Sequence, residues 1–392
     1  MSYETYRVAD LIDEIAMGPF GSNIKVSCFV DSGVPVLNGS NLEGFSLSEK
    51  AFRFVTKEKA DSLNKANAHR GDIVITHRGT LGQIAFIPQD SRYDRYVISQ
   101  SQFRVRCNDK VLPEYLVYYF HTPIGQHKLL SNASQVGVPA LARPSSTFQQ
   151  IEVVLPELSI QKRVVEIIST IQKKIANNQE LNDNLADLLQ TVYQDRFGNT
   201  SLVANQGFLS DICSYSRDKV AVSELNVSTY FSTENMLPGK AGSTEATSLP
   251  TTPQTTACHK GDTLISNIRP YFKKIVYCAD KCGCSTDVLC FTPSQPQYSA
   301  YLFSTLYADK FFAFMVAGSK GTKMPRGDKQ QIMTYPVVLP SEVALGDFNA
   351  IALPLIDQIY SYRAENKRLS LLRDTLLTKL MSGEIDVSDI QL

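Results

Sequence analysis

No run of apolar residues in this sequence approaches the ~18 residues that a membrane-spanning helix needs. The first fifteen or so residues carry charges and lack the apolar core of a secretory signal peptide. Net charge is also absent, because 39 lysines and arginines balance 39 aspartates and glutamates among 392 residues. Neutrality argues neither for nor against nucleic acid, since a basic patch can coexist with acidic residues elsewhere. We expect a cytoplasmic protein with two or three domains.

Residue patterns that carry catalysis are missing as well. The sequence has no Asp/Asn/Ser-Pro-Pro-Tyr/Phe run for methyl transfer to an amino group and no glycine-rich loop for S-adenosylmethionine. Residues 318–323 (GSKGTK) lack the spacing of a phosphate-binding loop. The five histidines are scattered, and no Ser/His/Asp arrangement or carboxylate pair stands out. We predict that the chain performs no chemistry itself.

Eight cysteines are present, and four of them cluster at Cys278, Cys282, Cys284 and Cys290. Nothing in the sequence indicates secretion, so reduced thiols are expected. The spacing differs from the paired C-x2-C knuckles of zinc sites. We therefore predict apolar, partly buried cysteines and no metal site.

A long amphipathic stretch from Ser159 to Phe197 dominates the middle of the sequence. Its seam positions recur in steps of three and four, which is the heptad pattern of a coiled coil. Ser159 is a suitable N-cap, and Gly198 suits the left-handed residue after a helix. At about 1.5 Å per residue, this helix would be roughly 57 Å long. Its predicted seam is Ile168, Ile171, Ile175, Asn178, Asn182, Leu185, Leu189 and Val192.

A second long helix is predicted between residues 341 and 392, and its pattern repeats the first. When the two helix sequences are aligned with residue 168 opposite residue 352, most seam positions of the second helix are also apolar. A Leu-Pro pair precedes each helix in this alignment. Pro354 has no counterpart in the first helix, and we expect it to kink the second helix or make it restart. The predicted second seam is Leu355, Ile359, Tyr362, Asn366, Leu369 and Leu376.

Duplicated units call for a pseudo-two-fold axis, and such an axis across the two helices makes them antiparallel. In that register Asn366 lies against Asn178 or Asn182. A buried polar pair costs stability but penalises slipped registers that set an asparagine against leucine. The alternative is that these asparagines lie at a solvated edge of the seam.

The segments before the two helices also repeat each other. Residues 1–157 and 199–340 both show short β-branched runs separated by turn signals, then a helix, a loop of small residues and a closing strand. Gly71-Asp72 and Gly261-Asp262 recur at one place, where a turn aspartate would accept bonds from its own backbone. We predict four parts: a mixed α+β domain (1–157), a long helix (158–198), a second α+β domain (199–340) and another long helix (341–392).

The order of these elements resembles that of the specificity subunit of type I restriction-modification systems. The matching runs are GPFGSNIK (18–25), GDIVITHRGTLG (71–82), GDTLISNIRP (261–270) and the Leu-Pro pair with a long helix that closes each half. The resemblance covers essentially the whole chain. It implies two target recognition domains, each reading one half of a split DNA site, and an antiparallel coiled coil between them.

The same resemblance implies the partners. They are double-stranded DNA, two adenine methyltransferase subunits and, in the full complex, restriction subunits that translocate and cut. S-adenosylmethionine, ATP and magnesium would belong to these partners, and none to this chain. Gln161 is typical of the family, whereas Leu345 stands at the aligned place of the second helix. Two alternatives remain open, namely a nuclease with an undetected site and a coiled-coil adaptor with protein-binding ends.

Candidate DNA contacts are cations and amides in glycine-flanked or polar loops. Arginine and lysine neutralise phosphates, and arginine, lysine, asparagine and glutamine read base edges. Residues 267–274 join three cations to two aromatics, while 318–328 is a basic, glycine-rich loop whose alternative is a solvated surface. The predicted contacts are Ser22, Asn23, Lys25, His77, Arg78, Gln135, Arg143, Asn267, Arg269, Lys273, Lys274, Lys320, Lys323 and Arg326.

Overall fold

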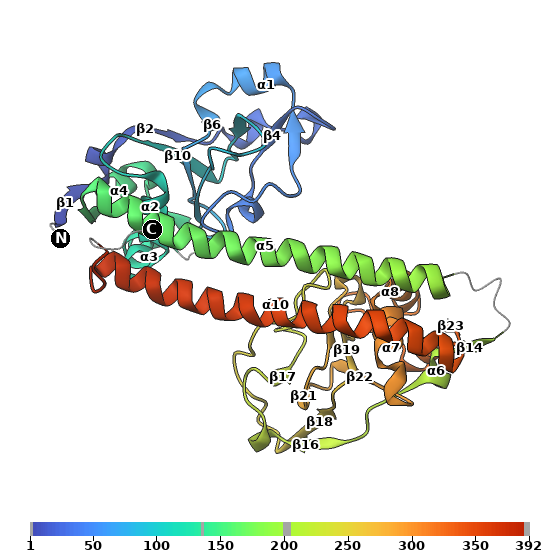
Figure 1. Ribbon diagram of the computed structural model, residues 1–392. Coiled ribbons are helices and arrows are strands. Elements are labelled where there is room, and N and C mark those ends of the chain that lie inside the picture. Colours follow the sequence, from blue (N-terminus) through green and yellow to red (C-terminus); the bar gives the residue numbers. More distant parts are fainter. Residues whose placement is uncertain (1–2, 135–136, 199–204, 388–392) are drawn as a thin grey trace. The chain divides into compact units, whose positions relative to one another are not determined.

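The computed structural model describes residues 3–134, 137–198 and 205–387, and the chain forms two compact units (Figure 1). Unit 1 consists of residues 1–175 and 368–392, and unit 2 of residues 176–367. These bounds differ from the four predicted segments because each long helix gives one part to each unit. Within the described residues, no helix combines the length and the apolarity that crossing a membrane requires.

Unit 1 is built on a four-stranded antiparallel sheet in the order β2-β10-β7-β8. A second sheet has the order β3-β5-β4-β9-β6, and two short pairs, β1-β13 and β11-β12, complete the strands. The strand bounds are β1 Tyr3–Arg7, β2 Ile12–Met17, β3 Phe29–Val30, β4 Val34–Val36, β5 Arg53–Val55, β6 Asn67–His69, β7 Ile73–Thr76, β8 Ile84–Phe86, β9 Arg95–Val97, β10 Gln102–Cys107, β11 Ala133–Ser134, β12 Ala140–Leu141 and β13 Glu152–Pro156. The short helices are α1 Lys57–Ser62, α2 Pro113–His121, α3 Pro123–Leu130 and α4 Pro144–Gln150.

Unit 2 repeats the four-stranded central sheet and the outer two-stranded pair, whereas its second sheet has four strands in place of five. Its central sheet has the order β15-β22-β19-β20, a second sheet follows β16-β18-β21-β17, and β14 pairs with β23. The strand bounds are β14 Gln206–Phe208, β15 Cys213–Tyr215, β16 Lys219–Ala221, β17 Tyr230–Phe231, β18 Gln254–Cys258, β19 Thr263–Ser266, β20 Ile275–Tyr277, β21 Cys282–Cys284, β22 Val288–Pro293 and β23 Pro336–Val338. The short helices are α6 Leu209–Ile212, α7 Ser299–Tyr307, α8 Asp309–Ala317 and α9 Lys329–Met333.

A turn with the same backbone bonding opens the central hairpin of each unit. The carboxylate of Asp72 accepts the N–H of His69 at 2.9 Å, and that of Asp262 accepts the N–H of His259 at 2.8 Å. Both aspartates are buried. The sequence predicted these strand-entry turns from the Gly-Asp pairs alone.

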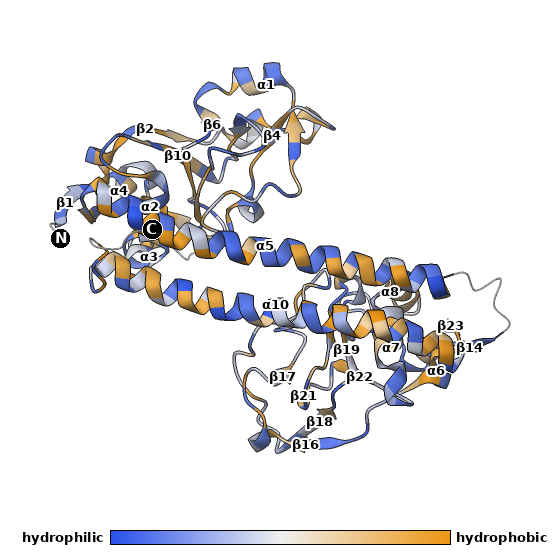
Figure 2. Ribbon diagram, in the orientation of Figure 1, coloured by the Kyte–Doolittle hydropathy of each residue, from blue (hydrophilic) through white to orange (hydrophobic). Residues whose placement is uncertain are grey.

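The long helices are α5 (Leu158–Phe197) and α10 (Glu342–Ser382), drawn green and red in Figure 1. Polar and apolar residues alternate along both (Figure 2). The expected restart at Pro354 is wrong, because α10 passes through this residue as one helix. Pro354 is exposed, so its ring and its missing N–H bond lie on the side away from the core.

Inside each unit the two helices run antiparallel. In unit 1 the Arg373 guanidinium donates to Oε1 of Gln172 at 3.1 Å, and Ile168 shares a core with Leu377 and Leu380. In unit 2 Asn178 contacts Asn366 and the ring of Phe197 contacts that of Phe348, so later residues of α5 meet earlier residues of α10.

The asparagine pair in unit 2 fixes this register. Nδ2 of Asn178 donates to Oδ1 of Asn366 at 2.9 Å and to Oε2 of Glu365 at 2.8 Å. Asn178 is fully buried, so it does not lie at a solvated edge. The predicted contact between Asn366 and Asn178 is thus confirmed. Every predicted seam residue is buried or half-buried.

The clustered cysteines lie in the core of unit 2. Cys258, Cys278, Cys282, Cys284 and Cys290 pack with Phe231, Met236, Leu264, Val276 and Val288. All five thiols are buried, and Sγ of Cys278 and Sγ of Cys282 are 3.6 Å apart. Their burial is the expected one, and it makes them part of the apolar core beneath the second sheet.

Candidate nucleic-acid interface

In unit 1 the turn between β7 and β8 pairs with the polar loop that follows α3. The N–H of Gly79 donates to the carbonyl of Pro139 at 2.8 Å, and the N–H of Leu141 donates to the carbonyl of His77 at 2.9 Å. An isolated bridge joins Arg78 to the same loop. Two of the predicted segments, which are far apart in sequence, therefore form one continuous surface.

Gln100 links this surface to the loop at residues 18–25. Its backbone carbonyl lies 3.1 Å from Nε2 of His77, and its side-chain amide lies against Gly21. Gly18 is needed here, because a Cβ at this position would lie 1.9 Å from the carbonyl oxygen of Ser99. Gln100 is exposed and of a type that reads base edges. Sequence reasoning missed it, since a single glutamine between two strands carries no motif.

Burial decides the role of His77. It lowers the pKa of His77, more than the hydrogen bond to Gln100 raises it. The ring is therefore mostly neutral near pH 7 and acts as a hydrogen-bonding group. The neighbouring Arg78 is exposed and carries the charge of this turn.

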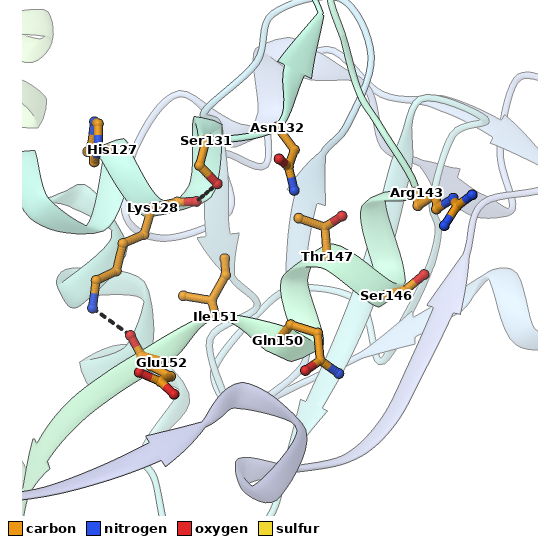
Figure 3. Close-up of a pocket in the computed structure, with 10 residues that line it drawn as sticks. All are labelled: His127, Lys128, Ser131, Asn132, Arg143, Ser146, Thr147, Gln150, Ile151 and Glu152. Carbon is orange, nitrogen blue, oxygen red and sulfur yellow. Dashed lines mark hydrogen bonds between the residues drawn. The ribbon is translucent and has the colours of Figure 1, made fainter.

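A hollow of about 650 Å³ opens beside Arg143 in unit 1 (Figure 3). Nζ of Lys128 donates to the carbonyl of Glu152 at 2.6 Å across one side of it. Figure 3 shows Arg143 and His127 at opposite ends of the lining. The remaining lining residues are Ser131, Asn132, Ser146, Thr147, Gln150 and Ile151. This lining offers hydrogen-bond donors and acceptors around one carboxylate, which suits contact with a polar surface.

In unit 2 the equivalent turn, between β19 and β20, pairs with the basic loop. The N–H of Arg269 donates to the carbonyl of Pro325 at 2.8 Å, and a bridge joins Ile268 to Arg326. The loop closes on itself, because Lys320 and Arg326 exchange backbone bonds of 2.9 and 3.0 Å. Unit 2 thus repeats the arrangement of unit 1 with more cations.

Acidic residues of unit 2 form ion pairs with several of these cations. Arg326 pairs with Asp287 at 2.9 Å, Lys320 with Asp328 at 2.5 Å and Lys273 with Asp309 at 2.9 Å. The lysines at positions 273 and 240 hold the pKa of Asp309 below its usual value. Exposed pairs of this kind contribute about 0–1 kcal/mol each, so phosphate could replace the carboxylate at little cost.

The predicted contacts differ in exposure. Asn267 is buried, and Lys274 is half-buried and donates to the carbonyl of Thr233 at 2.6 Å, so both face the interior of unit 2. Gln135 lies outside the described residues, and only the backbone of Ser22 is described, in a 3-10 turn. Arg269 and Lys273 are half-buried. The exposed candidates are Asn23, Lys25, Arg78, Arg143, Lys320, Lys323 and Arg326.

Comparison with known proteins agrees with this architecture. The family model described as type I restriction modification DNA specificity domain matches residues 3–186. The chain is 20% identical over 410 residues to the type I restriction enzyme MjaIX specificity subunit of Methanocaldococcus jannaschii, covering 97% of this chain and 93% of that protein.

A solved structure shares the fold along the whole chain. The crystal structure of the type I restriction-modification S subunit from M. genitalium superposes with a TM-score of 0.59 at 16% identity, covering 97% of this chain and 96% of that one. Its likeness supports the architecture of two units and two long helices. Residues 3–186 thus belong to the family of type I restriction modification DNA specificity domains, and the chain as a whole is similar to a type I specificity subunit.

Proposed function

We propose that this chain reads a bipartite DNA sequence, one half-site with each unit, and positions two adenine methyltransferase subunits on it. The observation that carries the proposal is the repeated surface. In both units the turn of the central hairpin is hydrogen-bonded to a polar loop, and this surface differs in side chains between the units. Similar scaffolds with dissimilar contact residues fit one task performed on two different sequences.

The division of labour follows from the absence of catalytic motifs in the sequence. S-adenosylmethionine, ATP and magnesium would be bound by the methyltransferase and restriction subunits. The long helices would dock the methyltransferases, and the complex would act in the cytoplasm, where its DNA is found. A strong dependence of DNA affinity on salt, if measured, would favour this proposal over a protein-binding adaptor, because phosphate contacts release counterions.

Methylation-sensitive sequencing of host DNA, with the gene present and deleted, tests the proposal directly. Half-sites read from one side of the duplex should be centred about one helical turn, roughly 10–11 bp, apart. The motif should therefore consist of two short, unlike blocks around an unread spacer of about 6–7 bp. A continuous motif, an ungapped palindrome or no methylation that depends on the gene would overturn the proposal.

The basic loop of unit 2 gives a second test. Replacing Lys320, Lys323 and Arg326 by alanine should weaken binding equally for all sequences and flatten the salt slope by up to about three units. The ion pairs of Lys320 and Arg326 with Asp328 and Asp287 reduce this effect, so Lys323→Ala alone should account for a large share. Lys281→Ala, which removes an exposed lysine paired with Glu224, is the matched control. Unchanged affinity at low salt would show that the loop is only a solvated surface.

A further inference from the structure

The turn between β19 and β20 holds two residues other than glycine in the left-handed region of backbone conformation. Arg269 has a φ of 50° and Lys273 a φ of 51°. They flank the short 3-10 helix at Pro270–Phe272. Residues with a Cβ avoid this region because the Cβ approaches the following carbonyl oxygen. Two of the six non-glycine residues with positive φ in the described part of the chain therefore flank one turn.

Unit 1 builds the corresponding turn, which is one residue shorter, without this strain. Ile75 pairs with Ile84 across its hairpin, as Ile265 pairs with Ile275 in unit 2. Counted from these pairs, Gly79 stands at the place of Arg269 and Gly82 at the place of Lys273. The two glycines also have positive φ, 94° and 87°. Since glycine satisfies this backbone freely, folding gives no reason for the two cations.

The tip between the cations presents two aromatic rings to solvent. Tyr271 is 50% exposed and Phe272 is 40% exposed, with ring centroids 4.8 Å apart. Three backbone bonds fix the turn. The N–H of Gly239 donates to the carbonyl of Phe272 at 2.8 Å, and the N–H of Lys240 donates to the carbonyl of Lys273 at 2.9 Å. The N–H of Arg269 donates to the carbonyl of Pro325 at 2.8 Å. The backbone that carries the two rings is thus fixed in the free chain.

Neither cation is engaged by a buried carboxylate among the described residues. Arg269 is half-buried, and its buried Nε has no hydrogen-bond partner among them, so a phosphate would bind the outer part of the guanidinium. Nζ of Lys273 contacts only an exposed carboxylate, that of Asp309, among its described ion pairs. An exposed ion pair is weak, so a phosphate can replace the carboxylate of Asp309 as the partner of Lys273. Strain retained at exposed positions is typical of functional sites.

We propose that residues 269–273, here called the aromatic turn, enter a groove of duplex DNA in the half-site read by unit 2. Arg269 and Lys273 bind phosphates on either side, and Tyr271 and Phe272 pack against base edges. Cations that position the protein on phosphates and apolar side chains that contact bases are the two parts of sequence-specific recognition. This inference rests on the proposed function and assigns the residues that carry it in unit 2.

The test uses the full chain with its methyltransferase partners and a duplex carrying the motif found by methylation sequencing. Arg269→Gly and Lys273→Gly should leave the unfolding temperature unchanged or higher, because strain is removed. Each should weaken DNA binding and lower the salt slope by about one unit. Ala51→Gly, which relieves a φ of 54° without removing charge, should leave affinity unchanged. Arg269→Asn, with a residue that tolerates this conformation, is the second variant if glycine loosens the turn.

The aromatic rings have a separate readout. Replacing Tyr271 and Phe272 by alanine should reduce discrimination at one or two positions of the second half-site by about fivefold to a hundredfold, the range for a base contact. Phe208→Ala removes an equally exposed ring, 54% exposed, and should change nothing. If the wild-type complex binds its motif and all aromatic-turn variants match it, this inference is overturned and the proposed function stands. A wild-type complex without sequence preference would overturn both.

Discussion

Asp72 in unit 1 and Asp262 in unit 2 occupy the same turn and accept the same backbone bond, yet they face different partners. Oδ1 of Asp72 accepts Nε of Arg106 at 2.9 Å, and its Oδ2 lies 3.4 Å from Arg104. In unit 2, Cys290 occupies the cross-strand place of Arg104 and donates its thiol to Asp262 at 3.2 Å. Burial accordingly raises the pKa of Asp262.

The two units share the backbone bond of this aspartate and differ in the side chains that contact it. The bond from the aspartate to its own turn is common to both units, so the backbone requires it. Among the described residues, the aspartate pairs with arginines in unit 1, whereas in unit 2 the ring of His259, 49% exposed, lies 3.8 Å from Asp262. A scaffold fixed by backbone bonding leaves side chains free to diverge, even in the core.

The largest effect is expected from removing the charge of the aspartate. Asp72→Asn removes the buried carboxylate beside Arg104, whose side chain is 5% exposed, and leaves Glu14, 2.7 Å away and 38% exposed, as the remaining counter-ion. Breaking a buried ion pair on one side costs about 3–5 kcal/mol, and the pair with Glu14 places this change at the lower end of that range. Asp262→Asn removes no ion pair with an arginine and should cost about 1 kcal/mol or less. Hydrogen exchange read by mass spectrometry reports on each unit separately, and equal losses in both units would contradict this account.

A second difference concerns the start of the long helices. Gln161 is 1% exposed; it accepts the N–H of Leu112 at 3.0 Å and donates to the carbonyl of Pro156 at 3.0 Å. The aligned Leu345 is apolar and lies in the core of unit 2. Gln161→Leu should destabilise unit 1 by roughly 2–3 kcal/mol, because it leaves two buried backbone groups without partners. The control is the volume-conserving Leu345→Met, which should cost below about 1.5 kcal/mol. A neutral Gln161→Leu would show that water replaces the amide.

The asparagine pair is expected to have a smaller effect, and its sign depends on the number of substitutions. From the sequence, Asn366→Leu alone should stabilise the helices and loosen their register. In the structure Asn178 would keep its bond to Glu365 and lose the other, so we now expect the single change to be close to neutral. Replacing both asparagines by leucine should stabilise unit 2 by about 1 kcal/mol, since neither member of the pair is then left as a buried polar group without its partner. Urea denaturation measures the difference, and a destabilised double variant would contradict it.

The smallest effect is a difference in pH dependence. The hydrogen bond from Arg104 holds the pKa of Glu14 below its ordinary 4.5, so this stabilisation is present above the unfolded pKa and lost as pH falls through the folded one. The pKa of Asp262 is raised above 3.8, so its contribution is present below the unfolded pKa and lost as pH rises through the folded one. Acidification should thus weaken unit 1 through Glu14 and favour unit 2 through Asp262. In hydrogen exchange, Glu14→Gln should flatten the response of unit 1 below about pH 4.5, and Asp262→Asn that of unit 2 above about pH 3.8.

Much of the fold could be predicted because its signals are local or periodic. The heptad spacing predicted α5, and the recurrence of an asparagine at 366 predicted the contact with Asn178. The Gly-Asp pairs predicted the turns at Asp72 and Asp262, since such an aspartate bonds its own backbone. The restart expected at Pro354 does not occur, and the sequence alone could not show that this residue is exposed.

The candidate interface was less predictable, because its chemistry depends on contacts between distant segments. Charge alone did not show that Asp287 lies against Arg326 or Asp309 against Lys273. Asn267 looked like a base reader and is buried. The sequence alone did not predict the left-handed backbone of Arg269, which in unit 1 is adopted by a glycine, Gly79. Exposure and backbone conformation, not residue type, separated the candidates.

The membership of the two units sets an order of synthesis and folding. Unit 2 is one continuous stretch, residues 176–367, whereas the core of unit 1 joins Phe120 to Leu377 and Leu380. At roughly 5–20 residues per second, unit 1 waits about 10–40 s for its last core residues after its first segment has been made. Unit 2 can complete its core during that interval. Unit 1, which the ribosome begins first, is therefore the last to bury its apolar surface. Until its last core residues are made, this surface can aggregate or bind chaperones.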